Sequence, residues 1–143
     1  MGSTEKELRR IFLKAVEGYY LSWYDWGGQG PGGIDCSGLV VEGLRACGKL
    51  ANQQDMTADM LWRTYRGDYT IDVPREGAIV FWFNKNGKAV HTAVAVGPYH
   101  CIGAHGGDAD VRDSVVAELE GAYVKYRPIN YRTDSFRCID LFK

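Results

Sequence analysis

Cys36 stands between a glycine-rich segment and an apolar run, in the stretch from Tyr24 to Val41 that reads YDWGGQGPGGIDCSGLVV. This pattern predicts a loop that delivers the thiol to the first turn of a helix. The N-terminus of a helix favours negative charge, and the thiolate is the nucleophilic form of cysteine. Unpaired backbone N–H groups at such a start can also hold an oxyanion beside the sulfur. The position therefore favours a nucleophile over a buried structural thiol.

His91 begins the sequence HTAVAVG, which alternates as a half-buried strand does. Its parity places His91 on one face with Ala93 and Ala95, whose small side chains leave room, and we expect this face to lie against a helix. In isolation, such a histidine would more simply bond to the backbone. With Cys36 in the same chain, it is predicted to act as the general base of a thiol hydrolase.

A third polar group is expected to hold the second nitrogen of the imidazole. If the next turn centres on Pro98, His105 on the following strand lies directly across from His91. A register two residues shorter would place Gly103 there, which offers only its backbone, and Asp108 is a further alternative. His105 is predicted as the orienting residue, with the other two left open.

The composition is that of an ordinary globular chain of 143 residues, with 45% hydrophobic and 24% charged residues. This length suits one domain, predicted to span 1–143, with 1–4 taken as a tag remnant or as disordered. The net charge of −1 argues against nucleic-acid binding. No stretch reaches the roughly 20 apolar residues of a membrane span, and no signal peptide is visible.

The remaining cysteines, Cys47, Cys101 and Cys138, are interpreted as buried small hydrophobic residues. No Cys or His cluster has the spacing of a zinc site. We therefore expect neither a metal nor a cofactor.

Capping residues and periodicity indicate the helices that position these groups. Thr4 and Glu7 form a capping box for a helix over 5–17, and Asp35 is the predicted N-cap of the helix that starts at Cys36. Further predictions are an end of this second helix at Gly48, a shorter helix from Thr57 to just before Gly67, and no regular structure over 23–33.

After Pro74 the period changes to that of strands. A continuous apolar strand over 77–83 and a turn over 84–87 lead into the strand that carries His91. The predicted strands lie at 77–83, 89–96 and 100–105, with others near 111–116, 123–127 and 138–141. Helices followed by an antiparallel sheet predict an α+β domain.

The combination of WGG, GIDCSGLV, an apolar strand after Pro74 and HTAVAVG closely resembles the NlpC-type cell-wall peptidases, over roughly residues 10–107. The resemblance implies a papain-like cysteine peptidase fold with the nucleophile at a helix N-terminus. It implies Cys36 as nucleophile, His91 as base and a polar residue on the next strand as orienter. Counted without gaps, that third position falls on Gly103, two residues before His105.

The same resemblance implies how substrate is bound. Asp35 and Ser37, which flank the cysteine, are expected to recognise the amino end of the substrate, and Tyr24 to line the acceptor groove. Trp26, close to Tyr24, either lines the same groove or anchors the loop. The expected substrates are peptidoglycan stem peptides, cut through a Cys36 thioester at the D-Glu–diaminopimelate type of bond.

Two alternatives to an endopeptidase remain at this point. One is an amidase or acyltransferase on the same scaffold, because a thioester can be resolved by water or by another acceptor. The other is a non-catalytic wall-binding module of a phage structural protein. The chain is expected to be made in the cytoplasm and to act at the bacterial cell wall or periplasm, with a phage tail, lysis system or toxin-secretion apparatus as a delivery partner.

Overall fold

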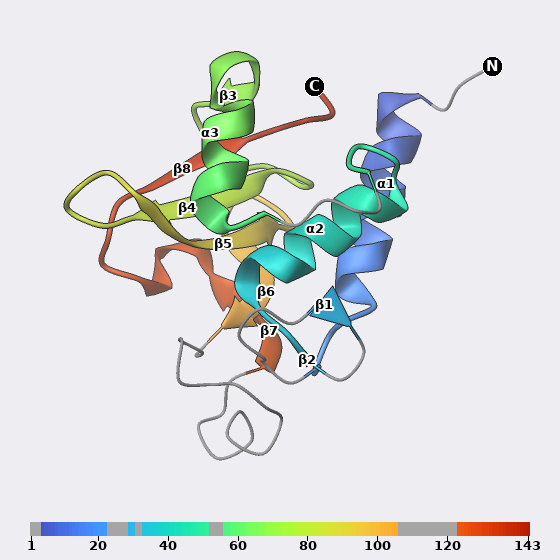
Figure 1. The fold of residues 1–143 in the computed structure, drawn as a ribbon, viewed down its shortest axis with the longest axis horizontal. Coiled ribbons are helices and arrows are strands. Elements are labelled where there is room, and N and C mark those ends of the chain that lie inside the picture. Colours follow the sequence, from blue (N-terminus) through green and yellow to red (C-terminus); the bar gives the residue numbers. More distant parts are fainter. Residues whose placement is uncertain (1–3, 23–28, 31–32, 52–55, 106–122) are drawn as a thin grey trace.

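The computed structural model describes residues 4–22, 29–30, 33–51, 56–105 and 123–143 (Figure 1). The helices begin at the predicted N-caps. The Thr4 hydroxyl accepts the Glu7 N–H at the start of α1 (Glu5–Glu17), and the Asp35 carboxylate accepts the Gly38 N–H at 2.6 Å at the start of α2 (Cys36–Ala46). Thr4 therefore belongs to the folded domain.

The third helix, α3 (Ala58–Tyr69), is longer than predicted. It begins at Thr57, whose hydroxyl accepts the Met60 N–H, but it continues through Gly67 to Tyr69. A glycine inside a helix costs only about 1 kcal/mol relative to alanine. Tyr69 packs on the core and its ring contacts that of Tyr65, with centroids 6.2 Å apart, so packing outweighs this local preference.

The main sheet is antiparallel, and within the described ranges it has the strand order β3-β8-β4-β5-β6-β7. The strands predicted from 77 to 105 and after 122 are present with small changes at their ends, while β3 was not predicted and the predicted strand near 111–116 lies outside the described residues. The bounds are β3 Thr70–Ile71, β4 Ile79–Phe83, β5 Ala89–Ala95, β6 His100–His105, β7 Tyr123–Pro128 and β8 Phe136–Ile139.

The glycine-rich segment before α2 contains regular structure, contrary to the prediction. Strands β1 (Gln29–Gly30) and β2 (Gly33–Ile34) form a short antiparallel ladder of their own. The glycines at positions 30 and 33 are themselves paired in this ladder, so they did not prevent pairing.

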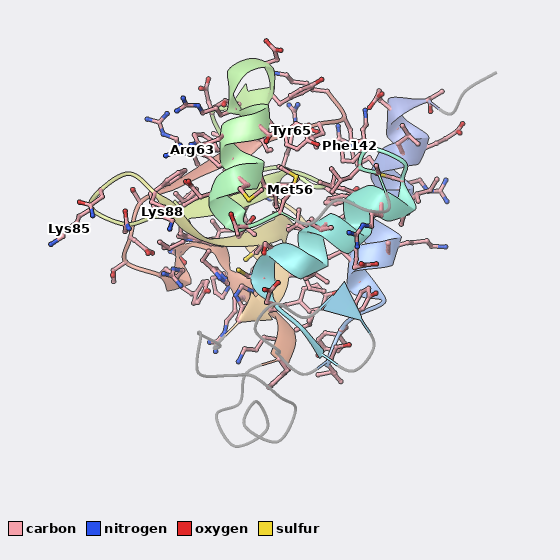
Figure 2. The ribbon with its side chains drawn as sticks, in the orientation of Figure 1. Met56, Arg63, Tyr65, Lys85, Lys88 and Phe142 are labelled. Atoms are coloured by element: carbon pink, nitrogen blue, oxygen red, sulfur yellow. The ribbon has the colours of Figure 1, made fainter. Side chains whose placement is uncertain are left out.

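The turn between β4 and β5 is built as its sequence predicts. The Asn84 side chain accepts the backbone N–H groups of Asn86 and Lys88, both at 3.0 Å, and Gly87 takes the left-handed conformation with φ 79°. Lys85 extends from the tip of this hairpin away from the rest of the fold (Figure 2). The turn leads into the pairing of β4 with β5, and a register shift between Trp82 and Phe83 places Trp82 across from His91.

The helices cover one face of the sheet (Figure 1). Leu39, Leu44 and Phe12 from the helices are fully buried against Phe81 and Val94 of the sheet. Each such side chain contributes roughly 1.5–3 kcal/mol of hydrophobic stabilisation.

Close contact between α1 and α2 depends on Gly43. A Cβ at this position would lie 2.6 Å from Val16 Cγ2 and 2.7 Å from Phe12 Cε1, closer than atoms can pack. The absent side chain thus lets α1 press α2 onto the sheet, which holds the start of α2 in place.

The opposite face of the sheet has a smaller core of its own. Val80, Trp82, Ala93 and Ala95 are buried there under Ile129 and other residues from the segment that follows β7. His91 shares the parity of Ala93 and Ala95, so its side chain belongs to this face. For Ala93 and Ala95 the predicted helix contact is therefore wrong, because the helices cover the valine face instead.

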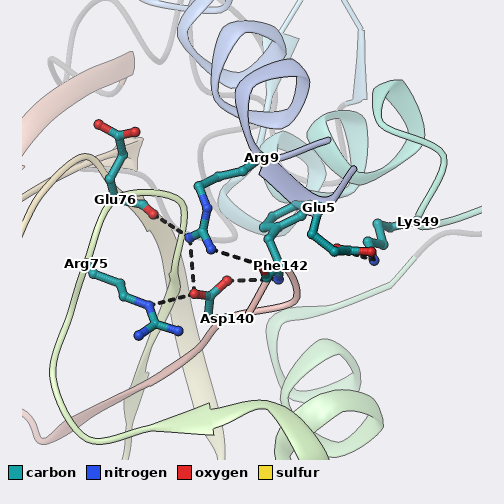
Figure 3. Close-up of polar contacts among 7 residues, drawn as sticks. All are labelled: Glu5, Arg9, Lys49, Arg75, Glu76, Asp140 and Phe142. Atoms are coloured by element: carbon teal, nitrogen blue, oxygen red, sulfur yellow. Dashed lines mark hydrogen bonds and ion pairs between the residues drawn. The ribbon is translucent and has the colours of Figure 1, made fainter. Parts of the chain in front are cut away.

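An ion cluster around a buried carboxylate joins α1 to the C-terminal end of the sheet (Figure 3). Asp140 is fully buried and accepts from Arg9 at 3.1 Å, from Arg75 at 2.6 Å and from the Phe142 N–H at 2.8 Å. Burial raises the pKa of Asp140, but these three donors outweigh burial and hold it below its usual range. Arg9 also donates to the Glu76 carbonyl, so α1 is fixed to the strand ends by charge as well as by packing.

Candidate active site

Cys36 is the first residue of α2 and is 8% exposed. The backbone N–H of Thr92, the residue after His91, donates to its sulfur. Helix α2 packs over β5 and β6, as Figure 1 shows, so residues far apart in the sequence meet here. The sulfur lies against the strand that carries the predicted base.

The availability of the Thr92 N–H follows from the pairing of β5. The Ala95 N–H donates to Ala78 on the β4 side and the Val96 N–H to His100 on the β6 side, so alternation directs the Thr92 N–H toward β6. The β5–β6 ladder runs only from Ala95 to Val94, and Thr92 lies just beyond it. The β5–β6 ladder therefore does not use the Thr92 N–H, which bonds to the sulfur of Cys36.

The two histidines of the predicted site lie side by side. His91 Nε2 and His105 Nδ1 are 3.1 Å apart, and the ring centroids are 5.2 Å apart. The register of β5 with β6 pairs Val94 with Ile102, which places His105 across from His91 as predicted for a turn centred on Pro98. Both rings are buried, His105 completely.

Gly103 provides the room for this arrangement. A Cβ on Gly103 would lie 2.8 Å from Ala93 Cβ and 3.0 Å from both Cε1 and Nε2 of His105. The imidazole of His105 thus occupies the space next to the glycine. This explains how a polar ring reaches His91 although the ungapped count from the family pattern falls on Gly103.

Tyr131 and Trp82 complete the surroundings of the two rings, and neither was predicted in this role. Tyr131 ends a short 3₁₀ turn, η1 (Ile129–Tyr131), and its hydroxyl lies 2.9 Å from His105 Nδ1. Trp82 packs on His91 with centroids 5.2 Å apart. The predicted turn at 84–87 alone would pair Trp82 with Ala89; a register shift between Trp82 and Phe83 brings Trp82 across from His91, and no sequence signal indicated Tyr131.

Comparison with known proteins identifies the family. The model of the NlpC/P60 family matches residues 22–133. The chain belongs to the NlpC/P60 family. Members of this family are cysteine peptidases that act on peptidoglycan, and the chain is an enzyme of this class.

Solved structures share the fold at low sequence identity. The P60 domain of Mycobacterium avium subspecies paratuberculosis antigen MAP1204 has a TM-score of 0.71 at 18% identity, with 97% of this chain and 98% of that chain covered. The NlpC/p60 domain of the peptidoglycan hydrolase SagA has a TM-score of 0.66 at 22% identity, with 93% and 98% covered. NlpC1 from Trichomonas vaginalis has a TM-score of 0.69 at 20% identity; the alignment covers 99% of this chain but only 45% of NlpC1.

The thiol of Cys36 and the imidazoles of His91 and His105 in this NlpC/P60 site are neutral at rest. Burial, and then the Asp35 carboxylate, raise the pKa of Cys36 to about 12. Burial and the charge of Arg132 lower the pKa of His91 to about 3, and burial and His91 lower that of His105 to about 2. The sequence led us to expect a thiolate at rest. The structure favours a protonated thiol instead, because desolvation affects the pKa of Cys36 more than the helix N-terminus does. A neutral imidazole is, however, the form that can accept a proton.

The residues that flank the cysteine are partly engaged within the fold. Asp35 accepts the Gly38 N–H, and the Ser37 hydroxyl lies 3.4 Å from the same carboxylate oxygen. Both are next to Cys36, and their role in substrate recognition stays a prediction. Tyr24, Trp26 and Asp108 lie outside the described residues.

Two searches of the described residues complete the description of the site. They contain no group of three or more His, Cys, Asp or Glu side chains that could hold a metal ion. None of the helices in the same ranges has the length and apolar character required to cross a membrane.

Proposed function

We propose that this NlpC/P60 protein is an endopeptidase that hydrolyses amide bonds in peptidoglycan stem peptides through a thioester on Cys36. In this proposal His91 is the base and His105 orients it. One observation carries the assignment: the sulfur of Cys36 accepts from the N–H of Thr92, the residue that follows His91, and the His91 ring lies 3.1 Å from that of His105.

The geometry supports a general-base mechanism rather than a preformed ion pair. Nε2 of His91 is occupied by His105, so Nδ1 is the nitrogen that receives the thiol proton as sulfur attacks the carbonyl carbon. The proton then passes from Nδ1 to the leaving amine, and water hydrolyses the thioester by the same steps in reverse order.

The start of α2 is suited to stabilise the oxyanion. Gly38 and Leu39 N–H groups bond to Asp35, whereas the Ser37 N–H points toward the sulfur. The backbone N–H of Ser37 is thus directed at the reacting centre, and its interaction strengthens as negative charge develops there.

The substrate that we propose is a stem peptide with a free amino end, cut at the D-Glu–diaminopimelate type of bond. The carboxylate of Asp35 and the hydroxyl of Ser37 would bind that amino end next to the nucleophile, with Tyr24 and Trp26 on the acceptor side. The place of action that we propose is the bacterial cell wall, since the family acts on its peptidoglycan. Delivery by a phage tail or secretion apparatus stays a prediction from the resemblance.

Digestion of purified muropeptides, followed by mass spectrometry, tests this proposal. We expect stem-peptide fragments from the wild type and from Cys47→Ala, a control that removes another buried thiol, and none from Cys36→Ala. His91→Ala should reduce the rate more than His105→Ala, because the base takes part in every proton transfer.

The alternatives give other outcomes in the same experiment. Acyl transfer to an added amine without net hydrolysis would favour the acyltransferase. Binding of muropeptides with no turnover by the wild type would favour the non-catalytic module.

A further inference from the structure

We propose that Tyr131, held by Arg132, is a positioning residue that fixes the tautomer of His105 and through it the tautomer of His91. This inference rests on the proposed roles of the two histidines. It concerns a residue that follows β7, on the sheet face opposite the helices, and it follows from counting donors and acceptors along one chain of hydrogen bonds.

The chain of hydrogen bonds begins at a group that can only donate. The Arg132 guanidinium donates to the Tyr131 oxygen and is itself held by Asp134 through two bonds of 2.9 and 2.8 Å. Because the phenol oxygen accepts from Arg132, its own proton is directed elsewhere. The His105 Nδ1 atom, 2.9 Å away, is the acceptor that the structure places in reach.

The direction of this bond decides the state of both rings. If Tyr131 donates to Nδ1 of His105, that nitrogen has no proton, and the proton of neutral His105 is on Nε2. His91 Nε2, 3.1 Å from the same Nδ1, must then be a donor as well, so the single lone pair of Nδ1 is shared by the Tyr131 hydroxyl and the His91 N–H in a three-centre hydrogen bond. The proton of neutral His91 is therefore on Nε2, and its Nδ1 lone pair is available to the thiol.

Without Tyr131 the opposite arrangement would be preferred. Nε2 of His105 is buried and has no hydrogen-bond partner in the described structure. A buried N–H without a partner is unfavourable, so an isolated His105 would place its proton on Nδ1 and donate to His91. His91 would then carry its proton on Nδ1, where it cannot serve as a base. The Tyr131 hydroxyl opposes this tautomer.

Long-range ¹H–¹⁵N correlation spectra of histidine-labelled protein test the proposal directly. The chain has 3 histidines, so a His100→Gln variant assigns the remaining signals. We expect Nε2–H tautomers for His91 and His105 in the wild type, and conversion of His105 toward the Nδ1–H tautomer in Tyr131→Phe. An Nδ1–H tautomer of His105 in the wild type, or no change in Tyr131→Phe, would overturn the proposal.

A matched control and a second variant separate this effect from general loss of structure. Tyr126→Phe removes a hydroxyl that also makes a hydrogen bond, to Glu17 at 2.6 Å, but outside the site, and should leave the spectra unchanged. Arg132→Met keeps Tyr131 and should shift His105 in the same direction as Tyr131→Phe, by a smaller fraction. No shift in Arg132→Met would contradict the role of the arginine.

Kinetics provide the functional readout. We expect Tyr131→Phe to lower kcat about tenfold with little change in KM. A fall in kcat of about tenfold corresponds to the loss of one hydrogen bond to the His91–His105 pair. A rise in KM alone would place Tyr131 in substrate binding and contradict the proposal. The tautomers are measured without substrate, so they can be determined even if muropeptides prove not to be cleaved.

Discussion

Gly103→Ala tests whether the contact between the two histidines controls catalysis. The new methyl group would lie 2.8 Å from Ala93 Cβ and 3.0 Å from the His105 ring. An ordinary contact needs about 3.4 Å or more, so His105 must move by roughly 0.5 Å or the strands must separate by a similar amount. A movement of this size disturbs the 3.1 Å contact between His91 and His105 and weakens its hydrogen bond.

The expected result is a loss of about 10- to 100-fold in kcat for muropeptide cleavage, since misplacement of a catalytic group by less than 1 Å costs this much. Overpacking should also lower stability by about 1–3 kcal/mol, measured by thermal unfolding. Gly97→Ala is the matched control, because a Cβ there would meet nothing within 4 Å. A Gly103→Ala enzyme that folds and turns over at the wild-type rate would refute the argument that this contact matters.

Two further predictions follow from the charged groups. Asp140→Asn should destabilise the fold by about 2 kcal/mol, because Arg9 and Arg75 lose their carboxylate, and urea unfolding measures this. The pKa of Asp140 is lowered by folding, so its contribution is complete above the ordinary carboxyl pKa and is lost as the pH falls through the lowered value; equal acid sensitivity of wild type and Asp140→Asn would contradict this. Because the pKa of His91 is lowered to about 3, kcat/KM should hold its plateau down to about pH 5, and an acid limb near 6.5 would show that the base is not this buried ring.

Much of the site could be predicted because it rests on local patterns. Asp35 caps α2 through a bond three residues away, and that cap alone places Cys36 at the helix start. Alternation along β5 and a turn centred on Pro98 were enough to bring His105 across from His91. The extension of α3 past Gly67 and the pairing of β1 with β2 were missed because weak local preferences yielded to packing and pairing.

The charge states and the support of the site could not be predicted in this way. Tyr131 meets His105 across 26 residues of sequence, and Thr92 meets Cys36 through the packing of α2 on the sheet. The packing of the sheet faces decides the surroundings of His91, and burial raises the pKa of the Cys36 thiol. Capping and alternation act over a few residues, so they can be recognised from neighbouring positions in the sequence. Desolvation and the direction of hydrogen bonds depend on what surrounds each group, and only the tertiary structure determines those surroundings.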